Sequence, residues 1–205
     1  MPPEQQVALA KIAPTLLLDW FETETNLSAI AAALDKPAAA EAALADLNQT
    51  VAAARQTFAP LVAQSPQVLM LSSTDLKEIR LFTSQENYCA ELIETLGFES
   101  MARPGQEAAP LSVEALPQFQ DADLALLFGV NWAVLGQPTD GERFEQHQLG
   151  PLQRAWQGSA IAQSLPVSQA EQVYFLPAYL CLGLPGPIGT ELYLNELKRQ
   201  LLPPE

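Results

Sequence analysis

Polar and aromatic side chains follow three apolar segments that the sequence predicts as strands. Residues 72–74 (SST) close the first segment and lead to Arg80 and Phe82, Asn131 and Trp132 follow the second, and Tyr179 follows the third. Ligands of open parallel sheets bind beyond the carboxyl ends of the strands. We therefore interpret these side chains as a candidate binding site, which offers a cation, aromatic faces and an amide. Such a set suits an anionic or aromatic solute better than a covalent reaction.

An alternative interpretation of the same residues involves packing only. Phe82 and Trp132 would then fill the layer of loops, and Arg80 would pair with a carboxylate such as Glu78. Large aromatic side chains in loops are often simply buried. The sequence leaves both interpretations open.

Signatures of catalysis are missing from the sequence. It contains no G-x-G-x-x-G, no phosphate-binding Walker loop and no G-x-S-x-G. His147 is the only histidine, so a catalytic triad has one possible base and no metal site is spelled out. The prolines of LPGPIGT, residues 184–190, favour a rigid helix entry over a phosphate site. We expect no enzymatic activity, cofactor or bound metal; a deep pocket holding His147 beside an acidic residue would reopen the question.

An acidic side chain, Glu114, stands in the first turn of a short helix that we expect to begin at Val113 and to be capped by Ser112. The helix N-terminus stabilises such a carboxylate by about 0.3 to 1 kcal/mol without any partner. A rigidly held, exposed charge is also a good docking point for another protein. These two interpretations are compatible.

Composition and charge narrow the class of protein. The chain has 205 residues, 48% of them hydrophobic, and 24 acidic against 10 basic side chains give a net charge of −14. Such a chain can bury a real core, and its acidity makes nucleic acid an improbable partner. We expect Cys89 and Cys181, which stand among apolar neighbours, to be buried free thiols. No leader peptide or membrane-spanning segment is predicted.

The first third of the chain contains two kinds of predicted element. IAPTLLL, residues 12–18, is typical of a short buried strand, whereas the alanine-rich sequence from Asn26 favours helix, with Asn26 as the first N-cap. A second helix from about Pro37 to about Gln64 carries one apolar stripe and would extend on the order of 40 Å. We interpret it as a strut across the surface of a domain, not a coiled-coil arm.

From residue 67 onward, predicted strands alternate with helices. The strands fall at 67–73, 98–102, 124–129 and 173–179, and the helices at 86–97, from 113 onward, around 151–158 and at roughly 189–202. A possible hairpin occupies residues 74–85. This alternation predicts an α/β fold, a three-layer αβα Rossmann-like lobe with a mostly parallel sheet, preceded by the long helix.

The order of these segments resembles the second half of a known family. IAPT, the long helix, VLML, ETLGF, LSVEALPQFQDADLALLF and VYFLPAY followed by GPIGTELYLNEL are similar to the periplasmic solute-binding proteins of ABC importers for ferric siderophores, haem and cobalamin. In that family two α/β lobes are joined by one rigid helix and hold the solute between them. The resemblance implies that residues 1–25 are a remnant of an N-terminal lobe, 26–66 the inter-lobe helix and 67–205 the C-terminal lobe.

The resemblance also implies a function and partners. A ferric chelate or corrinoid would be captured without covalent chemistry and delivered to a membrane permease, in the periplasm or another extracytoplasmic compartment. Each lobe of the family presents a glutamate to arginines of the permease, and Ser112-Val113-Glu114 matches the Ser-x-Glu pattern of the C-terminal lobe. Trp132 and the loop TDGE have no clear counterpart in the family, so the resemblance does not define the solute.

One alternative to transport remains. A lobe without its twin would act as a structural or interaction module that pairs with itself, as a homodimer, through the apolar surface left bare. The sequence does not distinguish a natural half from a fragment.

Overall fold

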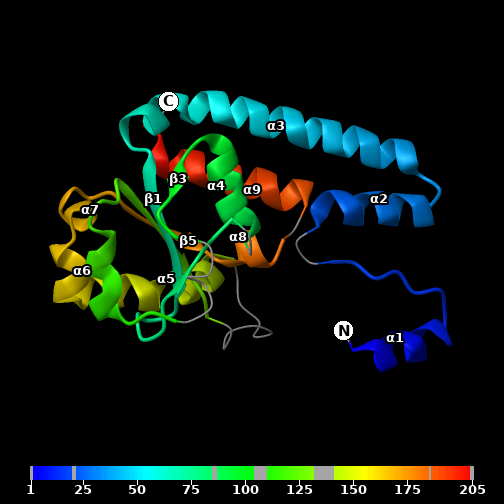
Figure 1. Cartoon of the computed structure of the whole chain (residues 1–205), viewed down its shortest axis with the longest axis horizontal. Coiled ribbons are helices and arrows are strands. Elements are labelled where there is room, and N and C mark those ends of the chain that lie inside the picture. The colour runs from blue at the N-terminus through cyan, green and yellow to red at the C-terminus, as the bar shows by residue number, and fades with distance from the viewer. Residues whose placement is uncertain are drawn as a thin grey trace.

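The structure is a computed structural model of the whole chain (Figure 1). It describes residues 2–19, 22–84, 87–103, 110–131, 141–184 and 186–203.

A mixed, mostly parallel sheet forms the centre of the fold. Its strands are β1 (Gln67–Ser73), β2 (Arg80–Leu81), β3 (Glu99–Ser100), β4 (Leu124–Gly129) and β5 (Val173–Pro177). They lie in the order β2-β1-β4-β5, with β3 parallel to the first residues of β1 and β2 antiparallel to its last ones. The carboxyl ends of β1, β4 and β5 consequently lie at one edge.

Helices cover both faces of this sheet. On one face lie α3 (Pro37–Gln64), α4 (Tyr88–Leu96), α8 (Tyr179–Leu182) and α9 (Pro187–Leu201). On the other lie the 3₁₀ helix η2 (Val113–Phe119), α5 (Gly141–Gly158), α6 (Ala160–Ser164) and α7 (Pro166–Gln169). The predicted three-layer α/β fold is confirmed (Figure 1).

Strand alternation explains the two cores. Successive side chains of a strand point to opposite faces, so Val68 and Met70 pack under α3, α4 and α9. Leu69 and Leu71 pack under η2 and α5 to α7 instead. Because both faces are buried, residues 68–71 of β1 form an unbroken apolar run, as is typical of parallel strands.

The long helix α3 has the predicted bounds, Pro37–Gln64, and lies along the top of the molecule in Figure 1. Its 28 residues extend about 42 Å at 1.5 Å per residue. Ala54 and Phe58 are fully buried, and the Phe58 ring meets Phe98 edge-on at 6.2 Å. The apolar stripe therefore faces the sheet layer over the second half of the helix.

The preceding helix α2 (Thr23–Ala33) begins earlier than predicted. Its N-cap is Glu22, not Asn26. Asn26 lies inside the helix, where its side-chain oxygen accepts a hydrogen bond from the Asp19 backbone N–H at 3.0 Å. The N-cap prediction is wrong because this side chain bonds backward to the segment before the helix.

The segment 12–18 forms no strand, so that prediction is wrong as well. It links α1 (Pro3–Ala10) to the rest of the chain, and no strand of the described residues pairs with it. Leu16, Leu17 and Leu18 are 47%, 50% and 49% exposed. Apolar sequence alone does not make a strand, which exists only through hydrogen bonds to a neighbour.

The outer edge of the sheet is protected at one point. β5 is an edge strand, and the Gln200 side chain of α9 donates a hydrogen bond to the Phe175 carbonyl at 2.8 Å.

Cys89, in the first turn of α4, is fully buried and disulfide-bonded. The prediction of a free thiol at this position is wrong. The one other cysteine of the sequence is Cys181, which belongs to α8.

No helix among the described residues combines the length and the apolar character that crossing a membrane requires.

Candidate solute-binding site

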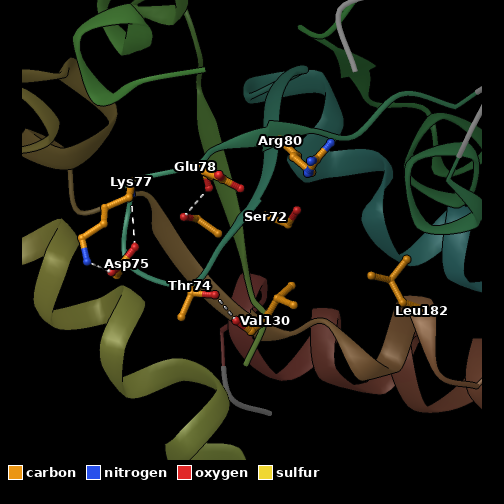
Figure 2. Close-up of a pocket in the computed structure, with 9 residues that line it drawn as sticks. Ser72, Thr74, Asp75, Lys77, Glu78, Arg80, Val130 and Leu182 are labelled. Atoms are coloured by element: carbon orange, nitrogen blue, oxygen red, sulfur yellow. Dashed lines mark hydrogen bonds and ion pairs between the residues drawn. The ribbon is translucent and has the colours of Figure 1, made fainter. Parts of the chain in front are cut away.

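A cavity of about 570 Å³ lies at the edge where β1 and β4 end (Figure 2). Its walls come from the end of β1, the loop after it, β2, the residue after β4, and α8. The lining residues are Ser72, Ser73, Thr74, Asp75, Lys77, Glu78, Arg80, Val130 and Leu182. We call this space the solute cavity.

The loop between β1 and β2 is held by hydrogen bonds of hydroxyl groups. The Ser73 hydroxyl donates to the Glu78 carbonyl at 2.7 Å and accepts from the Leu76 N–H at 2.9 Å. Thr74 donates through its hydroxyl to the Val130 carbonyl, which joins this loop to the end of β4 (Figure 2). The hydroxyls of Ser73 and Thr74, predicted as solute contacts, are therefore used to hold the loops that form the cavity wall.

Charges on the cavity wall are unevenly compensated. Lys77 and Asp75 form an ion pair at 2.7 Å, and the hydrogen bond from Lys77 lowers the pKa of Asp75. Arg80 is exposed, and among the described residues no carboxylate, Glu78 included, forms an ion pair with it. The guanidinium consequently retains its donors for an acceptor from solution.

Phe82 lies in the core instead of on the cavity wall. It is 7% exposed, and its ring stacks on Phe128 with centroids 4.9 Å apart. Its backbone N–H bonds to the Met70 carbonyl at 3.0 Å, which continues the pairing with β1 and turns the side chain inward.

Asn131 is fixed by its neighbour Gln148 of α5. Gln148, 5% exposed, accepts from the Asn131 N–H at 2.9 Å and donates to the Asn131 carbonyl at 3.0 Å. The Asn131 side-chain amide donates to the His147 carbonyl at 3.2 Å. Trp132 lies outside the described residues.

Sequence reasoning missed Gln148, but Gly129 is a signal that could have indicated it. A side chain on Gly129 would come within 2.3 Å of the Gln148 carbonyl, so only glycine lets α5 approach the end of β4 this closely.

Tyr179 begins α8 and is not among the residues that line the solute cavity. The hydroxyl donates to the Glu145 carboxylate at 3.0 Å, and the ring lies 5.5 Å from Phe144. Burial, and then the hydrogen bond and charge of Glu145, raise the pKa of Tyr179 to about 12. From α8 it is Leu182, three residues on and not predicted, that lines the solute cavity.

Glu114 is fully exposed in the first turn of η2. The Ser112 hydroxyl makes no capping bond to the helix backbone; its hydrogen bond to the Glu114 carboxylate lowers the pKa of that group. A shallow hollow of about 450 Å³ lies beside it, which we call the Glu114 hollow. It is lined by Asp75, Leu76, Lys77, Ser112, Val113, Glu114, Ala155, Gly158 and Ser159.

Within the described ranges, no three side chains of His, Cys, Asp or Glu gather where they could hold a metal ion.

A family model described as "Periplasmic binding protein" matches residues 3–180. The chain belongs to the periplasmic binding protein family. This is an extracytoplasmic, non-enzymatic class of solute-binding proteins. No curated protein matches the chain in sequence.

Solved structures share the fold at low sequence identity. SirA from Staphylococcus aureus superposes with a TM-score of 0.70 at 20% identity, over 96% of this chain and 71% of SirA. A FhuD fold-family periplasmic binding protein of a ferrichrome ABC transporter from Bacillus subtilis gives 0.70 at 21%, over 98% and 72%. An ABC transporter substrate-binding protein from Listeria monocytogenes gives 0.69 at 17%, over 97% and 71%.

Proposed function

We propose that this chain captures a ferric chelate of the siderophore type in the solute cavity and delivers it to an ABC permease. Family membership supports capture of a solute. Two similar structures support the class of solute, because SirA has been solved with staphyloferrin B and FhuD2 from Staphylococcus aureus with ferrioxamine B. Arg80 is the observation that carries the proposal: it is a cation without an ion pair among the described residues, on the wall of a cavity at the ligand-binding edge of the sheet.

The chemistry of the wall favours a chelate that bears carboxylates. A guanidinium binds a carboxylate through two parallel hydrogen bonds. Ser72 adds a hydroxyl on the same wall, whereas the hydroxyls of Ser73 and Thr74 are used within the loops. We retain Asn131, Trp132 and Tyr179 as predicted solute contacts, and we assign Phe82 to the core.

The division of the chain follows from the same proposal. Residues 67–205 form the C-terminal lobe, 26–66 form the inter-lobe helix, and 1–25 belong to the N-terminal lobe. High affinity in such a design requires burial of the solute between two surfaces. We therefore expect this chain to bind a chelate weakly by itself.

Calorimetric titration of the purified chain tests the proposed solute. The panel contains a carboxylate-rich ferric chelate, a hydroxamate ferric chelate, a corrinoid and the iron-free form of each chelator. We expect weak binding that is strongest for the carboxylate-rich ferric chelate. Tight binding of an unrelated metabolite, or no heat from any ferric chelate, would overturn the proposal.

Docking to the permease is the second part of the proposed function, and we assign it to Glu114. The carboxylate is exposed, and its hydrogen bond from Ser112 lowers its pKa further below neutral pH. Reversing its charge in Glu114→Lys should reduce chelate uptake by cells while leaving chelate affinity unchanged. Glu41→Lys, a change at an exposed glutamate of α3, is the matched control. Equal uptake by both variants would exclude Glu114 from docking.

Self-association as a homodimer stays a prediction. The exposed leucines of segment 12–18 favour it, and light scattering over a range of concentrations tests it.

A further inference from the structure

The loop between β1 and β2 separates the two hollows that the proposed function uses. Asp75 and Lys77 line both the solute cavity and the Glu114 hollow. Thr74 and Glu78 face only the first, and Leu76 only the second. The loop of residues 74–79 is thus one wall, in which residues 74–78 line the solute cavity, the Glu114 hollow or both, and Ile79 is buried.

The conformation of this wall must be held in place. Leu76 has a φ of 67°, in the left-handed region that a branched apolar side chain rarely adopts, and it is 6% exposed. Such a backbone persists only when the surrounding contacts enforce it. The Ser73 side chain makes a hydrogen bond with the Leu76 N–H and another with the Glu78 carbonyl, two residues later.

Ser73 uses its hydroxyl fully inside the loop. The hydroxyl has one proton, which it donates to the Glu78 carbonyl, and it accepts the Leu76 N–H. The residue is 5% exposed. One bond is made at Leu76 itself and the other at Glu78, two residues later, so together they hold the strained backbone at Leu76.

The far end of the wall is connected to the docking surface. Ile79 and Leu111 exchange two backbone hydrogen bonds, of 3.0 Å and 2.7 Å. Arg80 directly follows Ile79, and Ser112, the partner of Glu114, directly follows Leu111. A displacement of the loop therefore moves the candidate solute cation and the candidate docking residue together.

We propose that Ser73 is a positioning residue whose two hydrogen bonds fix residues 74–79 as a common wall, so that solute affinity and the Glu114 surface both depend on it. The part of this inference that concerns solute affinity rests on the proposed function. Ser73 acts through Arg80 and through the Ile79–Leu111 pair and needs no contact of its own with the solute.

The experiment compares three variants of the full chain. Ser73→Ala removes both hydrogen bonds, and Ser73→Thr keeps the hydroxyl. Thr190→Val is the matched control, because the Thr190 hydroxyl is also buried and has two bonds, to the Gly186 carbonyl at 2.9 Å and the Tyr88 hydroxyl at 2.6 Å. Thr190 lines neither hollow.

The first measurement is amide hydrogen exchange of the unliganded proteins, which needs no solute. We expect Ser73→Ala to accelerate exchange at Leu76, Ile79 and Leu111 by about tenfold or more, since removing roughly 1.4 kcal/mol of protection is a factor of ten. The amides of β4 should stay protected in all variants. Ser73→Thr and Thr190→Val should leave exchange at these three sites unchanged.

The second measurement is the dissociation constant for the ferric chelate that binds best. We expect the dissociation constant to rise about tenfold in Ser73→Ala and less than about twofold in Ser73→Thr and Thr190→Val. If Ser73→Ala left exchange at Leu111 unchanged, or if Thr190→Val weakened binding equally, the inference would be overturned. If the wild-type chain bound no chelate, the proposed function would fail, and exchange at Leu76, Ile79 and Leu111 would still decide the role of Ser73.

Discussion

The solute cavity and a second, larger groove differ in size and in chemistry, and the larger of the two is the less suitable binding site for an anionic solute. The solute cavity measures about 570 Å³. A rear groove of about 710 Å³ lies where α3 and α9 end, lined by Thr57, Pro60, Leu61, Gln64, Lys198, Arg199, Leu201, Leu202 and Pro203. Volume alone would favour the rear groove.

The arginines of the two hollows show why volume is a poor guide. Arg199 of the rear groove is held by Glu196, which accepts hydrogen bonds from two nitrogens of its guanidinium. Arg80 of the solute cavity has no ion pair among the described residues. A cation that is already neutralised offers little to a ligand, whereas one without a partner gains most from an anionic ligand. The useful criterion is therefore which polar groups remain unsatisfied.

Both hollows depend on a stably folded lobe, and the largest expected effect concerns the disulfide of Cys89 in the core under α3, α4 and α9. We expect Cys89→Ala to lower the free energy of unfolding in oxidising buffer by about 2 to 5 kcal/mol, because the cross-link restricts the unfolded chain. Denaturant unfolding monitored by circular dichroism measures this. In reducing buffer the wild type and the variant should be equally stable. A variant as stable as the wild type in oxidising buffer would show that the bond contributes nothing.

Removing one cation from each hollow tests the comparison directly. Arg80→Ala should weaken binding of the carboxylate-rich ferric chelate by about tenfold or more, since a hydrogen bond to a charged group contributes about 1.5 to 3 kcal/mol. Arg80→Lys should have an affinity between those of the wild type and Arg80→Ala, because an ammonium keeps the charge but lacks the planar fork of the guanidinium. Lys198→Ala, the matched change in the rear groove, should leave binding unchanged. If the Lys198 variant lost as much affinity as the Arg80 variant, the assignment of the two hollows would be reversed.

The smallest effect concerns Tyr179, the first residue of α8, whose hydroxyl donates to the Glu145 carboxylate. The raised pKa of Tyr179, about 12, means that the unfolded chain loses this proton first as the pH rises above about 10. Its contribution to stability is therefore complete below pH 10 and declines between pH 10 and 12. The Tyr179→Phe variant should show a shallower fall of the unfolding midpoint over that interval. Burial also raises the pKa of Tyr88, Tyr174 and Tyr193, so only the difference between wild type and variant isolates Tyr179.

Elements governed by local sequence could be predicted well. The bounds of α3 follow from a run of alanines behind a proline, and Gly97 ends α4 with a φ of 107°, as a helix C-cap glycine does. The apolar runs of β1 and β4 were found because strands buried on both faces carry a continuous apolar signal.

Features that depend on distant residues could not be predicted. The leucines of segment 12–18 have the composition of a strand, but pairing is decided by a neighbour that the sequence does not specify. The Cys89 disulfide requires two side chains to meet in space, which spacing does not reveal. In the candidate site, the edge of the sheet and Arg80 were found from topology, whereas Gln148 and Leu182 come from helices whose approach is set by packing.

The hydrogen bond from Gln200 to the Phe175 carbonyl has a consequence for the behaviour of the protein in concentrated solution. Exposed edge strands invite growth of the sheet by added strands from other molecules. At Phe175 the acceptor that an incoming strand needs is already occupied from within the molecule. This protein should therefore resist fibrous aggregation along β5, and a chain shortened before Gln200 should lose that resistance.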